Sequence, residues 1–287
     1  MNDRVEVRKT YKLFIKGAFP RSESGRTYEV HDTDDKFLAN AAKASRKDAR
    51  DAVLAARAGF DGWSAATAYN RGQVLYRVAE VMEGRREQFI ADVQAAEGSG
   101  DKKSARVVDA AIDRLVWYAG WADKYAQVVG NTNPVAGPYF NFTIPEPTGV
   151  VAAIAPQDSS LLGLVSVIAP IVVTGNAVIV VASTRRPIPA ITLTEVLATS
   201  DVPPGVINVL TGDPAEIAPW LASHGDVNAI DLTGVTSAEL AKKLEIEAAG
   251  TVKRVRPPAQ PNWLANPDLG PLRSFVETKT VWHPLGA

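Results

Sequence analysis

The sequence predicts an α/β protein: a Rossmann-like five-stranded parallel sheet with N-terminal helices and a protruding β-arm. From Gly149 onward, short apolar runs rich in β-branched residues alternate with helical stretches, which is typical of repeated strand-helix units. The runs are dense in apolar residues, as expected for strands covered by helices on both faces. Two extended segments that flank this region predict the arm. The expected regions are an N-terminal helical part (1–137), the β-arm (138–148), the Rossmann-like domain (149–256), a linker (257–271) and a C-terminal strand (272–287).

The N-terminal part begins with a short polar strand section, from Tyr11 to Val30, and continues as helices to about Val129. Ser45 followed by Asp48 is typical of a helix N-terminal cap. Apolar residues then recur at helical spacing in three stretches, which predicts three helices that each bury one face. The stretches are 49–60, 74–82 and 107–116.

Five runs form the predicted parallel sheet, with one helical stretch between neighbouring runs. The segment Pro203-Pro204-Gly205 supplies the turn before the third strand. We expect Gly175, Asn176 and Gly212 to serve turn geometry rather than nucleotide binding, because glycine and asparagine adopt the backbone conformations that tight turns require. The predicted strands are 150–154, 177–181, 206–210, 229–232 and 252–255.

A proline-rich stretch from Pro257 to Asn262 ends this pattern, because proline cannot continue a helix or a central strand. Beyond it, residues 274–282 alternate between polar and apolar types, which predicts a strand. A matching extended segment, 139–144, precedes the parallel sheet, and we expect the two to pair as an antiparallel arm. Since a two-stranded arm is marginally stable in water, we expect it to pack on another chain.

Composition excludes several classes of function. The 31 basic and 32 acidic residues give a formal net charge of -1, so nothing attracts the chain to nucleic acid or an anionic membrane. Residues Met1–Glu6 are charged and lack an apolar signal core, so we expect a cytoplasmic protein. The chain contains no cysteine, which excludes disulfides and thiolate ligands. Its three histidines, His31, His224 and His283, lack metal-ligand spacing, so we expect no metal site.

Several segments resemble the aldehyde dehydrogenase family in order and spacing, and the resemblance extends to about Val255. They are Leu13–Gly17 with Ser24–Val30, which resemble the opening hairpin of the family, then Ala55–Phe60 with Trp63, Glu146–Val151, Gly175–Val178, Pro203–Gly212 and Leu232–Gly234. Each segment is weak alone, but the set is specific. In that family a cysteine thiolate attacks the aldehyde, hydride passes to a nicotinamide cofactor, a glutamate activates water, and an asparagine holds the developing oxyanion.

The chain departs from the family at the positions to which the resemblance assigns this chemistry. Pro156-Gln157-Asp158 replaces Pro-Trp-Asn, so a carboxylate stands where an amide would hold the oxyanion. Val181 and Thr184 replace the lysine and glutamate that hold the adenosine ribose, and Val235 replaces a serine near the pyrophosphate. We therefore expect no cofactor, with weak NAD binding as the alternative. The vestigial cofactor positions are Pro156, Asp158, Val181, Thr184, Gly212, Thr233, Gly234 and Val235.

The Glu-Leu-Gly-Gly segment that bears the general base of the family is replaced by Arg256-Pro257-Pro258. The catalytic domain that follows in the family has no counterpart before the last strand, which in the family completes an oligomerisation hairpin with the arm. The resemblance implies a non-catalytic subunit in a hetero-oligomer with a full-length aldehyde dehydrogenase. The alternatives are an NAD(P)-binding sensor and a weakly active aldehyde:NAD oxidoreductase. The expected partner-binding residues are Tyr139, Phe140, Phe142, Phe275, Val276, Thr278, Thr280, Val281 and Trp282.

Overall fold

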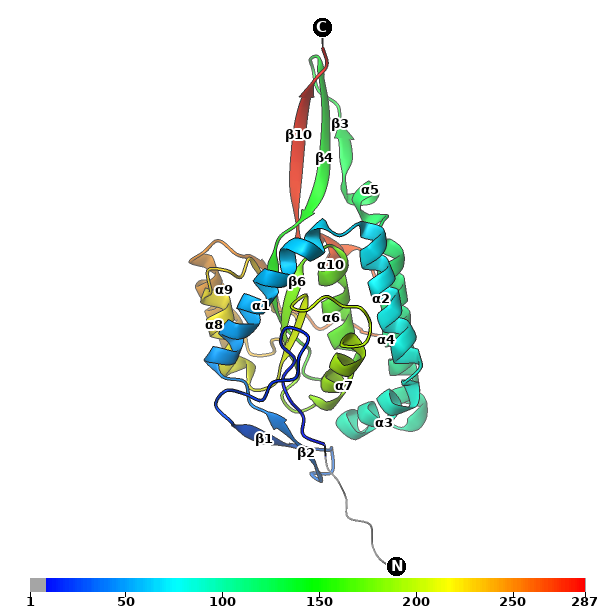
Figure 1. The fold of residues 1–287 in the computed structure, drawn as a ribbon, viewed down its shortest axis with the longest axis vertical. Helices are drawn as coiled ribbons and strands as arrows, with labels where there is room; N and C mark the ends of the chain where they lie inside the picture. Colours follow the sequence, from blue (N-terminus) through cyan, green and yellow to red (C-terminus); the bar gives the residue numbers. More distant parts are fainter. Residues whose placement is uncertain (1–8, 287) are drawn as a thin grey trace, which may run out of the picture.

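A five-stranded parallel sheet lies at the centre of the computed structural model, which describes residues 9–286 (Figure 1). The strand order is β7-β6-β5-β8-β9, which confirms the predicted α/β class and sheet. The charged stretch Met1–Glu6 lies outside the described residues. The strands are β5 (Val150–Ile154), β6 (Ala177–Val181), β7 (Ile207–Leu210), β8 (Ala229–Asp231) and β9 (Arg254–Arg256).

The fifth strand begins later than the predicted 252–255. Helix α9 (Ala238–Ala249) ends in a turn where the N–H groups of Val252 and Lys253 donate to carbonyls of the last helical residues. Val252 consequently has a left-handed φ of 52°, and the chain becomes extended only at Arg254. The β-branched Val252 was expected in a strand, but it lies in the turn that ends α9, because the last carbonyls of that helix need hydrogen-bond donors.

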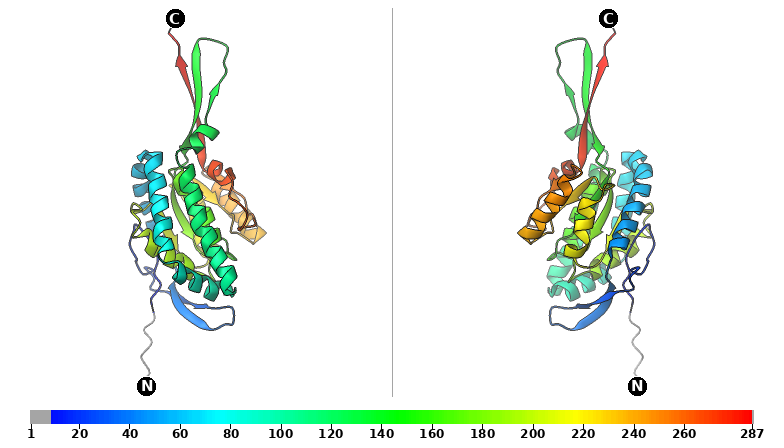
Figure 2. Two further views of the ribbon diagram at one scale, coloured as in Figure 1. Left: turned by 90° about the vertical axis from the view of Figure 1, so that its right-hand side faces the viewer. Right: turned by 90° about the vertical axis from the view of Figure 1, so that its left-hand side faces the viewer.

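Helices cover both faces of the sheet (Figures 1 and 2). Successive side chains of each strand enter two different cores, as the strand period of two requires: Val151 and Val178 pack in one core, and Val150 and Ile179 in the other. Consequently β5 and β6 are buried at every position. One core is covered by α1 (Arg46–Ala65), α8 (Pro214–Ser223) and α9, and the other by α2 (Ala68–Glu83), α4 (Asp101–Trp121), α6 (Leu162–Val173) and α7 (Ile188–Leu197).

The three helices predicted from apolar spacing are α1, α2 and α4. A further helix, α3 (Arg86–Glu97), lies between α2 and α4 and buries Phe89 and Val93 in the same core. A short helix, α5 (Tyr125–Val129), leads from α4 toward the arm. The helical block therefore ends at Val129, where the sequence places it.

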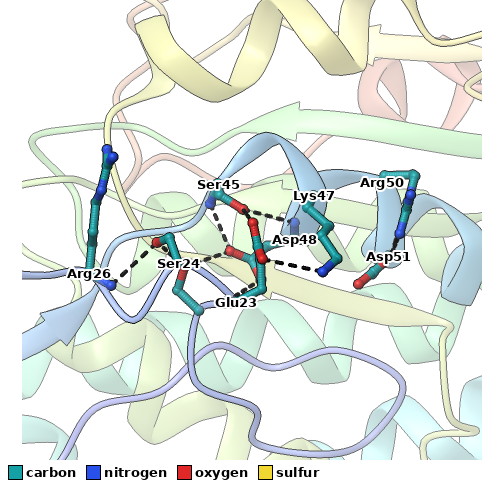
Figure 3. A network of polar contacts seen from close by, with 9 residues as sticks. Glu23, Ser24, Arg26, Ser45, Lys47, Asp48, Arg50 and Asp51 are labelled. Atoms are coloured by element: carbon teal, nitrogen blue, oxygen red, sulfur yellow. Dashed lines mark hydrogen bonds and ion pairs between the residues drawn. The ribbon is translucent and has the colours of Figure 1, made fainter.

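The cap predicted at the start of α1 is confirmed (Figure 3). The Ser45 hydroxyl accepts from the backbone N–H of Asp48 at 3.2 Å, and the Asp48 carboxylate accepts from the backbone N–H of Ser45 at 2.7 Å. The buried Asp48 also accepts from the Ser22 hydroxyl at 2.7 Å and from the N–H of Glu23 at 3.1 Å. One carboxylate thus caps α1 and fastens the N-terminal segment to it.

The N-terminal hairpin differs from the prediction. Its strands are β1 (Thr27–His31) and β2 (Phe37–Ala42), not Leu13–Gly17 with Ser24–Val30. Leu13–Gly17 instead contains a tight turn, with Lys16 and Gly17 both at positive φ. Phe14 exchanges backbone hydrogen bonds of 3.0 and 2.8 Å with Val209, so this segment covers the outer edge of β7.

An antiparallel arm stands off the body at the end opposite the β1–β2 hairpin (Figure 1). As predicted, the extended segment before the sheet pairs with the C-terminal strand: β4 (Tyr139–Pro147) pairs with β10 (Val276–Pro284) over their whole lengths. The arm has three strands rather than two, because β3 (Asn131–Asn133) pairs with the other edge of β4. The arm therefore starts at Asn131, before the predicted 138.

The linker between the body and β10 is held on the body rather than free. The Arg114 guanidinium donates to the carbonyls of Trp263 and Ala265, both at 2.8 Å, and burial lowers the pKa of Arg114. The predicted linker, 257–271, ends in a short helix, α10 (Gly270–Ser274), whose Leu272 is buried in the core. These contacts fix where β10 begins.

Over residues 9–286, no helix combines the length and apolar character needed to cross a membrane. The same part of the chain contains no group of three or more histidine, aspartate or glutamate side chains placed to hold a metal ion.

Candidate functional site

A cleft of about 660 Å³ opens at the carboxyl end of the parallel sheet, where α/β proteins bind ligands. The loops after β5, β6 and β8 and the first residues of α8 and α9 form its walls. The lining residues are Ile154, Gln157, Asp158, Thr184, Arg185, Arg186, Asp213, Pro214, Ala215, Gly234, Val235, Thr236, Ser237 and Leu240.

Gln157 binds both neighbouring strand ends within this cleft. Its side-chain N–H donates to the carbonyl of Ala155 at 2.8 Å, and its side-chain oxygen accepts from the N–H of Thr184 at 3.0 Å. The Ser183 hydroxyl donates to the backbone carbonyl of Gln157 at 3.0 Å. The side-chain amide of Gln157 therefore links the ends of β5 and β6 to each other.

Four of the eight vestigial cofactor positions line the cleft: Asp158, Thr184, Gly234 and Val235. The Thr184 hydroxyl donates to the carbonyl of Gly212 at 2.9 Å, so it is already used within the chain. Arg186 donates to the backbone carbonyl of Asp158 at 2.7 Å.

The other four positions, Pro156, Val181, Gly212 and Thr233, are buried and do not line the cleft. The Thr233 hydroxyl has no hydrogen-bond partner among the described residues.

Gly234, at the start of the turn between β8 and α9, lies where two backbone segments approach each other closely. A Cβ atom at this position would lie 2.2 Å from the carbonyl oxygen of Ala155, far inside van der Waals contact. The N–H of Gly234 donates to the carbonyl of Ile154 at 3.1 Å. Glycine is required here by the close approach of two backbones, whatever the cleft binds.

Four charged residues at this edge were not among the predicted site residues: Arg185, Arg186, Asp213 and Asp231. Arg185 and Arg186 lie in the loop after β6 and line the cleft. Asp231, at the end of β8, is fully buried; it accepts from the N–H of Thr233 at 2.8 Å and from Arg256 at 3.1 Å. The two adjacent arginines after a predicted strand could have been found from the sequence as candidate cleft residues. The pairing of Asp231 with Arg256 could not, because it depends on which strands are neighbours in the sheet.

The arm has two chemically different faces, because residues opposite each other in an antiparallel pair point to the same side. The face named here the apolar arm face carries Phe140, Phe142, Ile144 and Val281, and the Phe140 and Phe142 rings lie 5.5 Å apart. Charged and polar residues flank this apolar group on the same face, and Lys279 pairs there with Glu146 at 2.8 Å. Phe140 is 46% exposed and Ile144 is 39% exposed. Three of these four residues were predicted to bind a partner.

The polar arm face is a ladder of amide and hydroxyl side chains. Asn133 donates to the side-chain oxygen of Asn141 at 2.6 Å and to the Thr143 hydroxyl at 2.8 Å, and the Thr143 and Thr280 hydroxyls lie 3.1 Å apart. At the tip of this face, the rings of Tyr139 and Trp282 meet edge to face at 5.7 Å. These contacts join all three strands of the arm.

The root of the arm is held by buried polar contacts. The side chain of the fully buried Asn176 donates to the carbonyl of Phe275 at 2.8 Å and accepts from the N–H of Gly149 at 2.8 Å. Phe275 is 1% exposed and Val276 is 4% exposed, so these two predicted partner-binding residues instead pack in the core of their own chain. In the sequence, the alternation of polar and apolar residues runs from β10 into the body without a break, so it does not mark where the arm ends.

The fold and the cleft define an α/β protein whose candidate ligand side is the carboxyl edge of a parallel sheet, with an attached β-arm. Residues 19–256 match the aldehyde dehydrogenase family. The chain therefore belongs to the aldehyde dehydrogenase family, as the sequence motifs predict.

The chain spans about half the length of the curated relatives it matches. It is 32% identical over 251 residues to the putative aldehyde dehydrogenase DhaS of Bacillus subtilis, covering 86% of this chain and 50% of the relative. It is 34% identical over 259 residues to retinal dehydrogenase 2 of Gallus gallus, covering 88% and 48%.

Solved structures of the family share the fold. The NAD+ complex of an aldehyde dehydrogenase from Bacillus cereus gives a TM-score of 0.81 at 26% identity and covers 86% of this chain and 50% of that one. A variant of betaine aldehyde dehydrogenase from Staphylococcus aureus, also in complex with NAD+, gives a TM-score of 0.80 at 25% identity, covering 85% and 49%.

Proposed function

We propose that this chain is a non-catalytic member of the aldehyde dehydrogenase family, which assembles with a full-length aldehyde dehydrogenase and stabilises or positions it. The observation that carries the proposal is the arm. It is complete, anchored in the core and apolar on one face, while the cleft lacks the groups that the family uses for catalysis. We propose that this assembly acts in the cytoplasm.

The lack of catalysis is supported by the side chains available. No cysteine occurs among the 287 residues, so the chain has no thiolate nucleophile. Asp158 lies where the family carries an asparagine, and an anion there would repel a developing oxyanion. Arg256 is paired with Asp231 and is followed by two prolines, where the family carries its general base.

The arm supports assembly with a partner through its unpaired edge. The strand order β10-β4-β3 leaves the outer edge of β10 without a partner strand among the described residues. Such an edge binds another strand through backbone hydrogen bonds, and alternate side chains provide specificity. In the family that the sequence motifs resemble, the corresponding strand extends a catalytic-domain sheet of the neighbouring subunit, and the β10 edge could extend the same sheet of a full-length partner.

The contacts in the cleft support the expectation that no dinucleotide cofactor binds. Thr184 and Val181 replace the two groups that the resemblance assigns to the adenosine ribose, and the Thr184 hydroxyl and the Gln157 amide are both used within the chain. We therefore expect titration of the 287-residue chain with NAD or NADP to give no heat of binding at millimolar concentrations. The Bacillus cereus relative is the positive control. Tight stoichiometric binding, or NADH formed from short aldehydes, would contradict the proposal.

The second candidate function is an NAD(P)-binding sensor, and one observation favours it. Arg185 and Arg186 line the same cleft as the first residues of α9, so cationic groups and a helix N-terminus border one cleft. The titration described above decides between the two functions, because the sensor requires saturable binding and the scaffold does not.

Removal of the apolar arm face is expected to abolish assembly. In the double variant Phe140→Ser with Phe142→Ser, the partner that copurifies with the wild-type chain should fall at least about tenfold, since buried aromatic anchors dominate interfaces. The matched control is Tyr69→Ser with Tyr76→Ser, which removes exposed aromatic rings from α2. Mass determination of the copurified protein identifies the partner. A wild-type chain that purifies as a monomer free of any dehydrogenase would refute the proposal.

A further inference from the structure

The strand β10 is self-complementary along its unpaired edge. In Figures 1 and 2 it lies at one side of the arm and projects from the body with β4. Its residues 277–283 carry complementary types at equal distances on either side of Thr280. We propose that two copies of this chain pair through β10, antiparallel, about a two-fold axis at Thr280.

This register places compatible side chains opposite each other. Thr280 faces its own copy, and paired threonines on a sheet surface form favourable hydrogen bonds. Lys279 faces Val281 of the second copy, where the methylene groups of the lysine can cover the valine. Glu277, whose carboxylate also accepts from Arg254 and from the Thr148 hydroxyl, faces the His283 imidazole, and Thr278 faces Trp282. Each of these contacts occurs twice, as two-fold symmetry requires.

The same register also aligns the faces of the two arms. Opposed residues point to the same side of a sheet, and 277, 279, 281 and 283 all lie on the apolar arm face. Pairing about Thr280 therefore joins the apolar arm faces of both copies into one surface of a six-stranded sheet. A slip of one residue would place the apolar face of one copy beside the polar face of the other.

Self-pairing satisfies backbone groups that β10 otherwise exposes to water. An exposed edge strand of nine residues tends to bind other strands, and a closed two-fold pair ends that association at two copies. The inference rests on β10 alone and does not depend on the proposed partner. It adds one consequence to the proposed function: a full-length partner that binds the β10 edge must displace the second copy.

The absence of cysteine from the sequence provides a specific test, because any disulfide formed by a single-cysteine variant must join two copies. With Thr280→Cys, mild oxidation should yield a covalent dimer at least about tenfold faster than with Thr278→Cys, since pairing raises the local concentration of the facing thiol. The two positions match in residue type, arm face and exposure. Thr278→Cys should cross-link efficiently only when mixed with Trp282→Cys.

Two results would overturn the inference. One is a folded wild-type chain that sediments as a monomer at tens of micromolar while Thr280→Cys and Thr278→Cys cross-link at equal rates. The other is faster self-linking by Thr278→Cys, which would show a different register. Circular dichroism of both variants confirms that each is folded. Neither result affects copurification of a full-length dehydrogenase, so failure here is distinguishable from failure of the proposed function.

Discussion

Replacing Asn176 with alanine is expected to release the arm from the body. The side chain of Asn176 joins three parts of the chain: it accepts from the N–H of Gly149 before β5, and donates to the Thr174 hydroxyl and to the carbonyl of Phe275 before β10. Alanine would leave the N–H of Gly149 without a partner, and an unsatisfied buried group costs about 1–3 kcal/mol. It would also remove one of the two bonds to the carbonyl of Phe275, which would still accept from the N–H of Thr148 at 3.2 Å. We expect a loss of about 3 kcal/mol in the free energy of unfolding.

The matched control is Asn208→Ala, because Asn208 is also fully buried and also joins strands through its side chain. It donates to the carbonyl of Gly205 at 2.7 Å and accepts from the N–H of Lys16 at 3.0 Å, both within the body. Both variants should unfold at lower urea concentration. Only Asn176→Ala should accelerate hydrogen exchange of the β10 amides. Equal exchange in the two variants would show that Asn176 does not anchor the arm.

Gly205→Ala is expected to prevent stable folding. Gly205 follows Pro203-Pro204 in the turn before β7 and has a φ of +92°, which side-chain-bearing residues rarely adopt. An added Cβ would lie 2.2 Å from the carbonyl oxygen of Ala55 in α1, and this backbone atom belongs to a packed helix that cannot move freely. We expect a loss of about 4 kcal/mol or more, seen as insoluble protein or a large decrease in the urea midpoint.

Gly25→Ala separates the two causes of this effect. Gly25 also has a positive φ, +67°, but a Cβ there would meet nothing within 4 Å. Only the backbone strain remains, which costs about 1–2 kcal/mol for alanine. If Gly205→Ala proved no more destabilising than Gly25→Ala, contact between α1 and the β7 turn could not be the reason for glycine at 205.

The parallel sheet was predictable because its strands are buried on both faces. β5 and β6 have the predicted bounds, since an unbroken apolar run of β-branched residues leaves little ambiguity when helices cover both sides. The cap of α1 was equally predictable from the sequence, because Ser45 and Asp48 are close in the chain and bond to each other. The pairing of β4 with β10 also followed from sequence, since both segments are long enough to show alternation.

Features that depend on distant contacts were not predictable. β3 is three polar residues long, and it is a strand because its backbone pairs with β4, where Asn133 also bonds to the side chains of Asn141 and Thr143. Phe275 continues the alternation of β10, yet its side chain lies in the core, and its carbonyl accepts from Asn176 and from the N–H of Thr148. In the cleft, motif comparison located the altered positions, whereas the bonds of Gln157 to Ala155 and Thr184 require the strand ends to be side by side.

The arm is built from segments that are far apart in the sequence, and this determines when it can form during synthesis. Thr143 of β4 and Thr280 of β10 lie 137 residues apart in the sequence. At roughly 5–20 residues per second, β10 leaves the ribosome about 7–27 s after β4. During this interval the nascent chain exposes the long edge of β4 together with Phe140, Phe142 and Ile144. When β10 is made, it thus covers the edge of the arm segment most prone to bind another nascent chain.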